Sequence, residues 1–462
     1  EGELSVSRTR VVFDTASAQV TTEGGSFADQ PLALELNVRE FENPVFSGRL
    51  AGEVDLAFAG PFLPAEKGIN LTGRCALEGT FEGRADAVED LVYDARAEFR
   101  DVFYADNVLP DTLHSLNGSA RFDPDEVTVE KMEAIFGAGD LTVTGRRTGH
   151  LPYFLPAEKE NRASLPRPEN SFTATSRRID IDKLFPAASP GAAADGAAAA
   201  APLPDSVATA AVPDILAAGT IAADTLIYSE VPFTGVTGNL RLADRVLTCT
   251  EVSAKVYGGT AAGNVAIDLG DLNDPGYSGT YEARQIEADN FVSRFVGRSG
   301  VLFGKTGLAG SFQARGKDPE RIKRTLSLDS EATMVSGKVV TGQFVGSALG
   351  NLAAKAGRDF QREQGLKDLS TLIKVENGRV GLNDLKTRLG NLGDLTLGGS
   401  YGFDGSLEYR GSLLLTREQT ESLYATGGLV GSVANLFGNQ AERLRLPLTV
   451  GGTMTSPRMD ID

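Results

Sequence analysis

The segment GVLFGKT at 300–306 is the part of the sequence closest to a chemical motif, the phosphate-binding loop of nucleotide-binding proteins. Its last three residues, GKT, match the end of that loop. The loop needs four residues between its glycines so that successive amides wrap a phosphate, whereas three residues separate Gly300 from Gly304. The following GLAGSFQARG is typical of a glycine-interrupted strand, not of a phosphate-binding helix. The sequence therefore predicts no nucleotide site here.

The other residues that could do chemistry lack the spacing for it. IDID at 179–182 and MDID at 459–462 place acidic residues at alternate positions, but no glycine-centred loop surrounds them to hold a calcium ion. His114 and His150 are the only two histidines, so a histidine-rich metal site is not expected. Among 62 acidic residues, spacing nominates no general acid and base. We expect no catalytic residue, no metal and no cofactor, and therefore a protein that is not an enzyme.

Cys75 and Cys249 are the only two cysteines and lie in the strand-like contexts GRCALEG and VLTCTEV. We interpret them as two separate small residues of a sheet. A disulfide between them is the alternative, although two cysteines in so long a chain are not a disulfide framework.

Composition narrows the range of partners. With 45 basic and 62 acidic residues the net charge is −17, which repels phosphate backbones, so no nucleic-acid partner is expected. No apolar run reaches the roughly 18–20 residues that a membrane-spanning helix needs. The chain begins at Glu1 without an initiator methionine and directly in a strand-like segment, so we expect that an upstream signal or anchor has been removed.

Alternation of apolar and polar residues is the dominant pattern. Leu32, Leu34, Leu36 and Val38 alternate with Ala33, Glu35, Asn37 and Arg39, and similar runs occur at 54–58, 252–256, 407–415 and 444–450. Turn residues such as EGG at 23–25 and ENG at 376–378 separate the runs. The sequence predicts a mainly β fold, a long curled antiparallel sheet resembling a groove or taco, built from repeated hairpins.

The hairpins recur as a degenerate repeat. EKMEAIFGAGDLTVTG at 130–145, TEVSAKVYGGTAAGNVAI at 250–267 and NDLKTRLGNLGDLTLGGS at 383–400 each contain a strand, a bulky residue, glycines and a second strand. In the second copy we expect Gly258 and Gly259 to form the two-residue turn, because glycine readily takes positive φ angles. Each hairpin must stack on its neighbours to bury its apolar face.

Three stretches interrupt the strand pattern, and we predict short amphipathic helices near 286–298, 341–372 and 417–444. Two interpretations of the second helix stay open. Its apolar stripe packs on the sheet, or it caps an apolar groove or rests at a membrane interface.

An Ala- and Pro-rich segment at 187–211 is predicted to be a flexible linker or a long surface loop, because such a composition cannot form a packed core. It divides the chain into an N-terminal β-repeat region, 1–186, and a C-terminal β region, 212–462, which contains the three predicted helices.

Segments between Ile215 and Asp462 carry a resemblance to a known family. They include VSAKVYGGTAAGNVAIDL, TGLAGSFQARG, VSGKVVTGQFVGSALGNLAA and LRLPLTVGGTMTSPRMDID. This half resembles the C-terminal region of the AsmA family. Upstream, LHSLNGSARFDPDEVTVEKMEAIFGAGDLTVTG and SFTATSRRIDIDKLF resemble the β repeats of the same AsmA and TamB-like proteins.

The resemblance implies a periplasmic β-rich body, anchored to the inner membrane of a Gram-negative bacterium by an N-terminal helix that this chain lacks. It implies a non-enzymatic lipid-binding protein that carries phospholipid acyl chains in an apolar β-groove between the inner and outer membranes and supports outer-membrane lipid homeostasis. The expected partners are phospholipid or another acyl lipid, the membrane, and outer-membrane assembly proteins. The alternative function is a scaffold for outer-membrane biogenesis that acts through protein contacts.

A lipid groove needs apolar residues on one face of the sheet, where each buried CH₂ contributes roughly 0.8 kcal/mol. The candidate groove residues are Val252, Ala254, Val256, Leu395, Leu397, Phe344, Leu349 and Leu352. Alternation with Val252 and Ala254 assigns Val256 to the apolar face.

Overall fold

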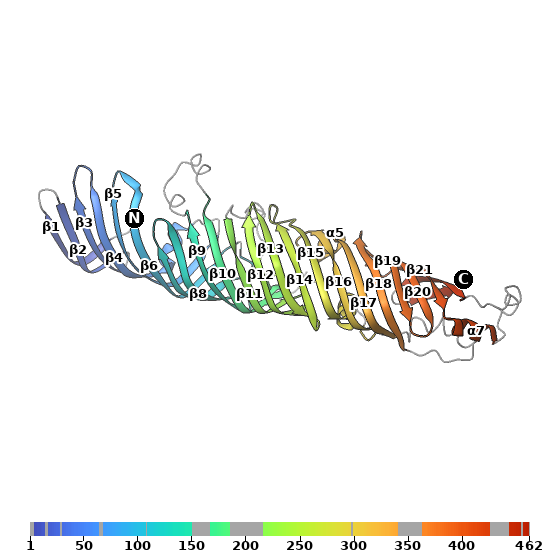
Figure 1. Ribbon diagram of the computed structural model, residues 1–462. Helices are drawn as coiled ribbons and strands as arrows, with labels where there is room; N and C mark the ends of the chain where they lie inside the picture. The colour runs from blue at the N-terminus through green and yellow to red at the C-terminus, as the bar shows by residue number, and fades with distance from the viewer. Residues whose placement is uncertain are drawn as a thin grey trace, which may run out of the picture. The chain divides into compact units, whose positions relative to one another are not determined.

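Hairpins of consecutive strands make up most of the computed structural model, so the chain is mainly β as predicted (Figure 1). The structure describes residues 4–13, 17–27, 30–63, 68–107, 109–149, 167–184, 216–296, 299–340, 363–425, 443–453 and 456–461. The chain divides into two compact units, unit 1 (Glu1–Thr250) and unit 2 (Glu251–Asp462), and the division falls inside strand β13 (Val246–Val256).

In unit 1 each strand from β1 to β12 pairs with the next in chain order. The strands are β1 (Leu4–Phe13), β2 (Ser17–Phe27), β3 (Gln30–Arg39), β4 (Val45–Asp55), β5 (Asn70–Arg84), β6 (Ala87–Ala105), β7 (Leu113–Phe122), β8 (Glu126–Phe136), β9 (Gly139–Thr148), β10 (Glu169–Asp180), β11 (Leu216–Tyr228) and β12 (Val231–Ala243). A 3-10 helix, η1 (Leu56–Phe62), follows β4, and helix α3 (Ile181–Leu184) follows β10.

One pairing in unit 1 departs from the predicted antiparallel order. Strands β10 and β11 run parallel, with Glu169 opposite Leu216 and Asp180 opposite Ile227. In a parallel pair, the chain must return to the starting end of the first strand before the second strand begins. The residues between α3 and β11 form this connection. The predicted linker, 187–211, belongs to this connection and lies outside the described residues. The sheet therefore continues directly from one side of the linker to the other.

In unit 2 the strands from β14 to β23 also pair in chain order, all antiparallel, and β14 to β19 lie side by side in Figure 1. The strands are β14 (Gly259–Asp268), β15 (Gly276–Glu287), β16 (Leu302–Arg315), β17 (Ser327–Val340), β18 (Glu363–Glu376), β19 (Arg379–Leu389), β20 (Gly393–Gly402), β21 (Leu407–Leu415), β22 (Arg445–Thr453) and β23 (Ser456–Ile461). The helices among the described residues of this unit are α4 (Ala288–Val296), α5 (Pro319–Thr325) and α7 (Arg417–Ala425).

For the three predicted helices, the structure gives different results. Helix α4 lies within the predicted 286–298, and α7 covers the first part of 417–444, of which 426–442 lies outside the described residues. For 341–372, residues 341–362 lie outside the described part, and the prediction is wrong for the remainder, which is strand β18.

Strand β18 contains a β-bulge. Leu366 and Leu369 are three residues apart because Asp368, with φ of 52°, inserts one extra residue into the strand.

Similar bulges occur in both units. Asp101 in β6, Gln285 in β15 and Asp384 in β19 also have positive φ angles, lie at register shifts, and expose their side chains. Each bulge leaves two consecutive exposed residues between two that face the other side. Because the extra residue lengthens only the exposed side, the strand bends toward its opposite face.

The turn after Lys255 also differs from the prediction. The two residues with positive φ are Tyr257, at 48°, and Gly258, at 71°, while Gly259 is the first residue of β14. A type I′ turn needs two positive φ angles, and a short hairpin tolerates a non-glycine residue at one of them. Gly259 is needed for a different reason, because a Cβ atom there would lie 2.3 Å from the carbonyl oxygen of Arg284.

Candidate functional site

On the described strands of unit 1, alternate residues lie between more exposed neighbours. We call the surface that these less exposed residues form the inner face of unit 1. Its large apolar members are half-buried and include Leu32, Leu34, Leu36 and Val38 on β3, Leu50 and Val54 on β4, Leu71, Leu77 and Phe81 on β5, and Leu91 and Phe99 on β6. The residues that are fully buried on the same face are small, such as Ala97 and Ala120 at 3% and 2% exposure. The small residues are therefore covered by their neighbours, while the large side chains stay partly open.

The strand register makes this face continuous. Leu34 is opposite Leu50, which is opposite Gly79, which in turn is opposite Ala95. At the next inward position of β5 after Gly79, the ring centroids of Phe81 and Phe46 are 6.3 Å apart. An apolar path therefore crosses neighbouring strands at right angles to the hairpins.

The inner face of unit 2, defined in the same way, is partly filled. One cluster joins Ala288 of α4 to Met334 and Leu366, with exposures of 1%, 3% and 4%. Another joins Leu413, Leu415 and Leu448 on β21 and β22. Both clusters lie toward the strand ends from which α4 and α7 leave the sheet. Large side chains pack together there, as in an ordinary hydrophobic core.

Tyrosines also lie on the inner faces of both units. Tyr281 on β15 and Tyr409 on β21 both lie at inner positions, and burial raises the pKa of each phenol above its ordinary value. Burial also raises the pKa of Tyr93 on β6 in unit 1. The phenolate form of these three side chains is disfavoured because burial removes water from around them.

The structure places the candidate groove residues as follows. Val252, Ala254 and Val256 share one face of β13, the first two half-buried and Val256 only 7% exposed. Leu395 and Leu397 are half-buried on β20, opposite Leu413 and Gly411. The strands β14 to β19 lie between the two groups in chain order, so they do not form one compact pocket. Phe344, Leu349 and Leu352 lie outside the described residues.

Sequence reasoning missed the bulges, although a signal for them exists. Pairs of polar residues between apolar ones, as in FRDV at 99–102, LKDL at 366–369 and LNDL at 382–385, interrupt the alternation at the bulge positions. At two positions with positive φ the backbone N–H is held in the same way: that of Asp101 donates to Asn117 Oδ1 and that of Glu251 donates to Asn264 Oδ1, both at 3.0 Å.

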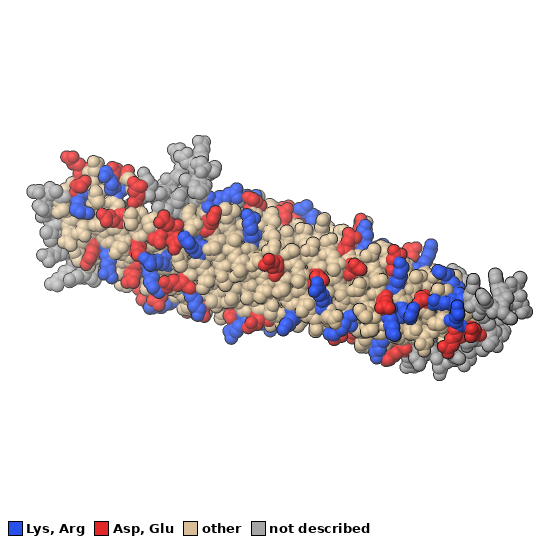
Figure 2. Space-filling model, viewed as in Figure 1, with Lys and Arg blue, Asp and Glu red and all other residues tan. Residues whose placement is uncertain are grey.

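The outward positions carry charge of both signs. Cross-strand ion pairs join Arg121 to Asp94 at 2.6 Å and Arg96 to Glu130 at 2.8 Å. Figure 2 shows basic and acidic side chains interspersed over the face in view. The units are thus polar outside, which keeps the outward positions hydrated.

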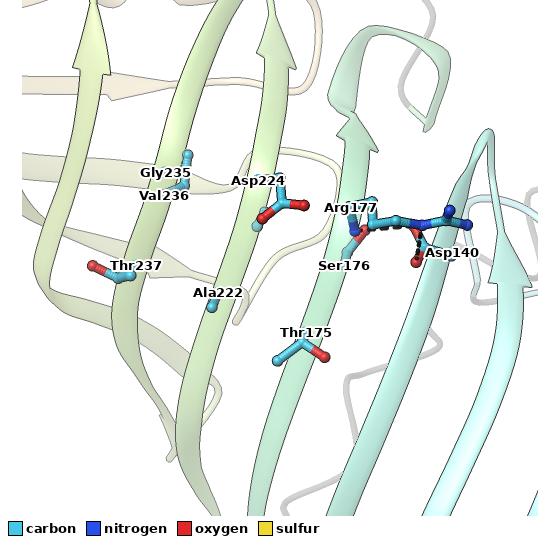
Figure 3. Close-up of a pocket in the computed structure, with 10 residues that line it drawn as sticks. Asp140, Thr175, Ser176, Arg177, Ala222, Asp224, Gly235, Val236 and Thr237 are labelled. Carbon is cyan, nitrogen blue, oxygen red and sulfur yellow. Dashed lines mark hydrogen bonds and ion pairs between the residues drawn. The ribbon is translucent and has the colours of Figure 1, made fainter.

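A depression of about 380 Å³, lined by both polar and apolar residues, lies in unit 1 where β10 and β11 run parallel (Figure 3). Arg177 Nε donates to Asp140 Oδ2 at 3.0 Å across its border. Burial opposes ionisation of Asp140, but the hydrogen bonds from Arg177 hold its pKa below the usual value. The depression depends on the parallel pairing, which no sequence pattern predicted.

Several of the residues considered above for chemistry lie in ordinary strands of the sheet. Gly304, Lys305 and Thr306 lie within strand β16, and Cys75 and Cys249 are free thiols. In the described part of the chain, no three His, Cys, Asp or Glu residues gather as a metal site would require, and no helix is long and apolar enough to cross a membrane.

A scan against protein-family models and searches of curated proteins and solved structures gave no match to this chain.

Proposed function

We propose that the inner faces bind the acyl chains of lipids and that the protein carries phospholipid between the inner and outer membranes, as its resemblance to the AsmA family implies. In this proposal it is a non-enzymatic, periplasmic protein held at the inner membrane. One observation supports it most: the large apolar side chains of the unit 1 inner face are half-buried, and the helices described in that unit, η1 and α3, are too short to cover them.

Physical chemistry favours an acyl occupant for such a surface. Each CH₂ that leaves water contributes roughly 0.8 kcal/mol, so a chain lying along the path from Leu34 to Ala95 is bound without any polar contact. The outward ion pairs remain in water. Binding of this kind is distributed over many strand positions and needs no compact site.

A pair of substitutions on adjacent residues tests the proposal. Leu34→Asp puts a charge on the inner face of β3, whereas Ala33→Asp puts the same charge on its exposed face. We expect Leu34→Asp to weaken binding of a fluorescent fatty acid, measured by titration, and Ala33→Asp to leave it unchanged. Leu397→Asp and Thr396→Asp form the equivalent pair in unit 2. Equal affinity of both members of a pair, with strand content retained in circular dichroism, would contradict lipid binding at that face.

The alternative is a scaffold for outer-membrane biogenesis, and one feature favours it. Among the described residues, β23 pairs with β22 alone and so leaves one strand edge for a partner. Pro457 on this strand lacks an N–H donor and makes the edge a poorer template, which is why lipid binding is the main proposal.

A further inference from the structure

Arg147 is a cation at an inward position of unit 1. On β9 it continues the series Leu141, Val143 and Gly145, whereas its neighbour Arg146 is exposed. The register sets Arg147 between Val127 of β8 and Asn170 of β10. On β3 to β9, as far as side chains are described, the other inward residues are apolar, small or uncharged.

Arg147 is half-buried, and the described residues do not satisfy all of its hydrogen-bond donors. Its Nε atom is buried and has no hydrogen-bond partner in the described structure. Arg146, by contrast, forms an ion pair with Glu126. A buried donor without an acceptor is unfavourable. A ligand with an anionic oxygen would supply the missing acceptor.

The location suits a headgroup better than an acyl chain. Arg147 is the penultimate residue of β9, so it lies near the strand end, while the apolar inward residues of the same strand continue away from that end. An amphiphile whose chains lie against the inner face would place its polar group at such a position. The guanidinium has five N–H donors in a planar fork that matches a phosphate.

We propose that Arg147 binds the phosphate of an anionic lipid, with the acyl chains on the inner face of unit 1. The inference rests on the proposed function and adds the chemical class of the headgroup. It distinguishes phospholipids from neutral lipids with the same acyl chains.

The test compares dioctanoyl phosphatidic acid with dioctanoylglycerol, which has the same chains without the phosphate. Both are titrated against the wild-type protein, Arg147→Gln and the control Arg146→Gln, by displacement of a fluorescent fatty acid. A charge-assisted bidentate contact is expected to give the wild type roughly tenfold tighter binding of phosphatidic acid. Arg147→Gln should lose that preference and keep the affinity for dioctanoylglycerol, whereas Arg146→Gln should behave like the wild type.

Further outcomes and variants distinguish a failure of the headgroup proposal from a failure of the acyl-binding proposal. If both lipids bind equally to the wild type, the acyl-binding proposal stands and the role of Arg147 is overturned. If neither binds, both proposals fail. Displacement of phosphatidic acid by millimolar inorganic phosphate alone would assign Arg147 to a free anion and overturn the headgroup role. Arg147→Lys, which keeps the charge, should restore part of the preference, and the unliganded Arg147→Gln protein should unfold at the same or a higher urea concentration than the wild type.

Discussion

The two units use the same hairpin but differ in what fills the inner face. In unit 1 the fully buried apolar residues are mostly small, such as Ala97, Val102 and Ala120, and the leucines on the strands of its inner face remain half-buried. In unit 2 Met334, Leu366 and Leu413 are almost completely buried in two clusters. The difference shows that alternation specifies a sheet with one apolar face, but the size of the buried residues decides whether that face is a core or an open surface.

The helices contribute to the same contrast. In unit 2, α4 supplies Ala288 to a cluster, and Thr420 of α7 is 0% exposed, with its hydroxyl accepting a hydrogen bond from the N–H of Leu444 at 3.1 Å. In unit 1 the described helices are η1 and the four-residue α3. We therefore expect unit 2 to contribute more to stability and unit 1 more to lipid binding.

The largest expected effect is a core truncation in unit 2. Leu413→Ala should lower the free energy of unfolding by about 2–5 kcal/mol, because a fully buried leucine leaves a cavity. Leu34→Ala in unit 1 should cost only about 1 kcal/mol, because that side chain is already partly hydrated. Urea titration followed by circular dichroism measures both. Equal losses would remove the distinction between a filled and an open face.

Deletions in β18 test the role of the bulges. Removing Asp368 leaves Leu366 and Leu369 separated by one residue, so both keep facing inward. Removing Lys374 instead turns Val375, now 6% exposed, to the outward side, at a cost of about 1.5–3 kcal/mol. The Asp368 deletion should therefore be the more stable of the two in urea. The reverse order would mean that the bulge holds the strand in register instead of bending it.

The reactivity of the two thiols measures how well water reaches their positions in unit 1. Cys75 lies on the inner face of β5, and burial raises its pKa and that of Cys249. A raised pKa lowers the thiolate fraction at neutral pH, so both should react with iodoacetamide several-fold more slowly than the same thiols in the urea-unfolded chain. Bound fatty acid should slow Cys75 further. Reaction at the unfolded rate, measured by mass spectrometry, would show that this face is hydrated.

The smallest effect is electrostatic. Hydrogen bonds from Arg443, at 2.7 Å, and Arg388, at 3.2 Å, lower the pKa of Asp394. A lowered pKa in the folded state gives stability that is present above the unfolded pKa and lost as the pH falls through the folded value. Because the carboxylate is 37% exposed, we expect Asp394→Asn to cost at most about 1 kcal/mol at neutral pH. The difference from wild type should shrink below about pH 4. A pH-independent difference in urea midpoints would exclude an ionic origin.

Much of the fold could be predicted from the sequence. The inward series Leu32, Leu34, Leu36 and Val38 and the placement of Val252, Ala254 and Val256 on one face follow from period-two alternation. Helix α4 also lies where the apolar spacing predicted it.

Other features could not be predicted, for physical reasons. A bulge changes the period locally, so Leu366 and Leu369 are three residues apart although both lie in a strand. The parallel pairing of β10 with β11 depends on the path of a connection whose composition specifies no direction. The alternation of Leu141, Val143 and Gly145 extends to Arg147, but the sequence does not show that its Nε atom is buried without a partner.

The most direct measurement of the central claim is mass spectrometry of organic extracts from the protein purified without detergent, beside an acidic protein of similar size from the same cells. The wild type and Ala33→Asp should carry phospholipid in stoichiometric amounts, and Leu34→Asp should carry clearly less. No lipid above the acidic control, in a protein whose strand content is intact, would contradict acyl binding and favour the scaffold.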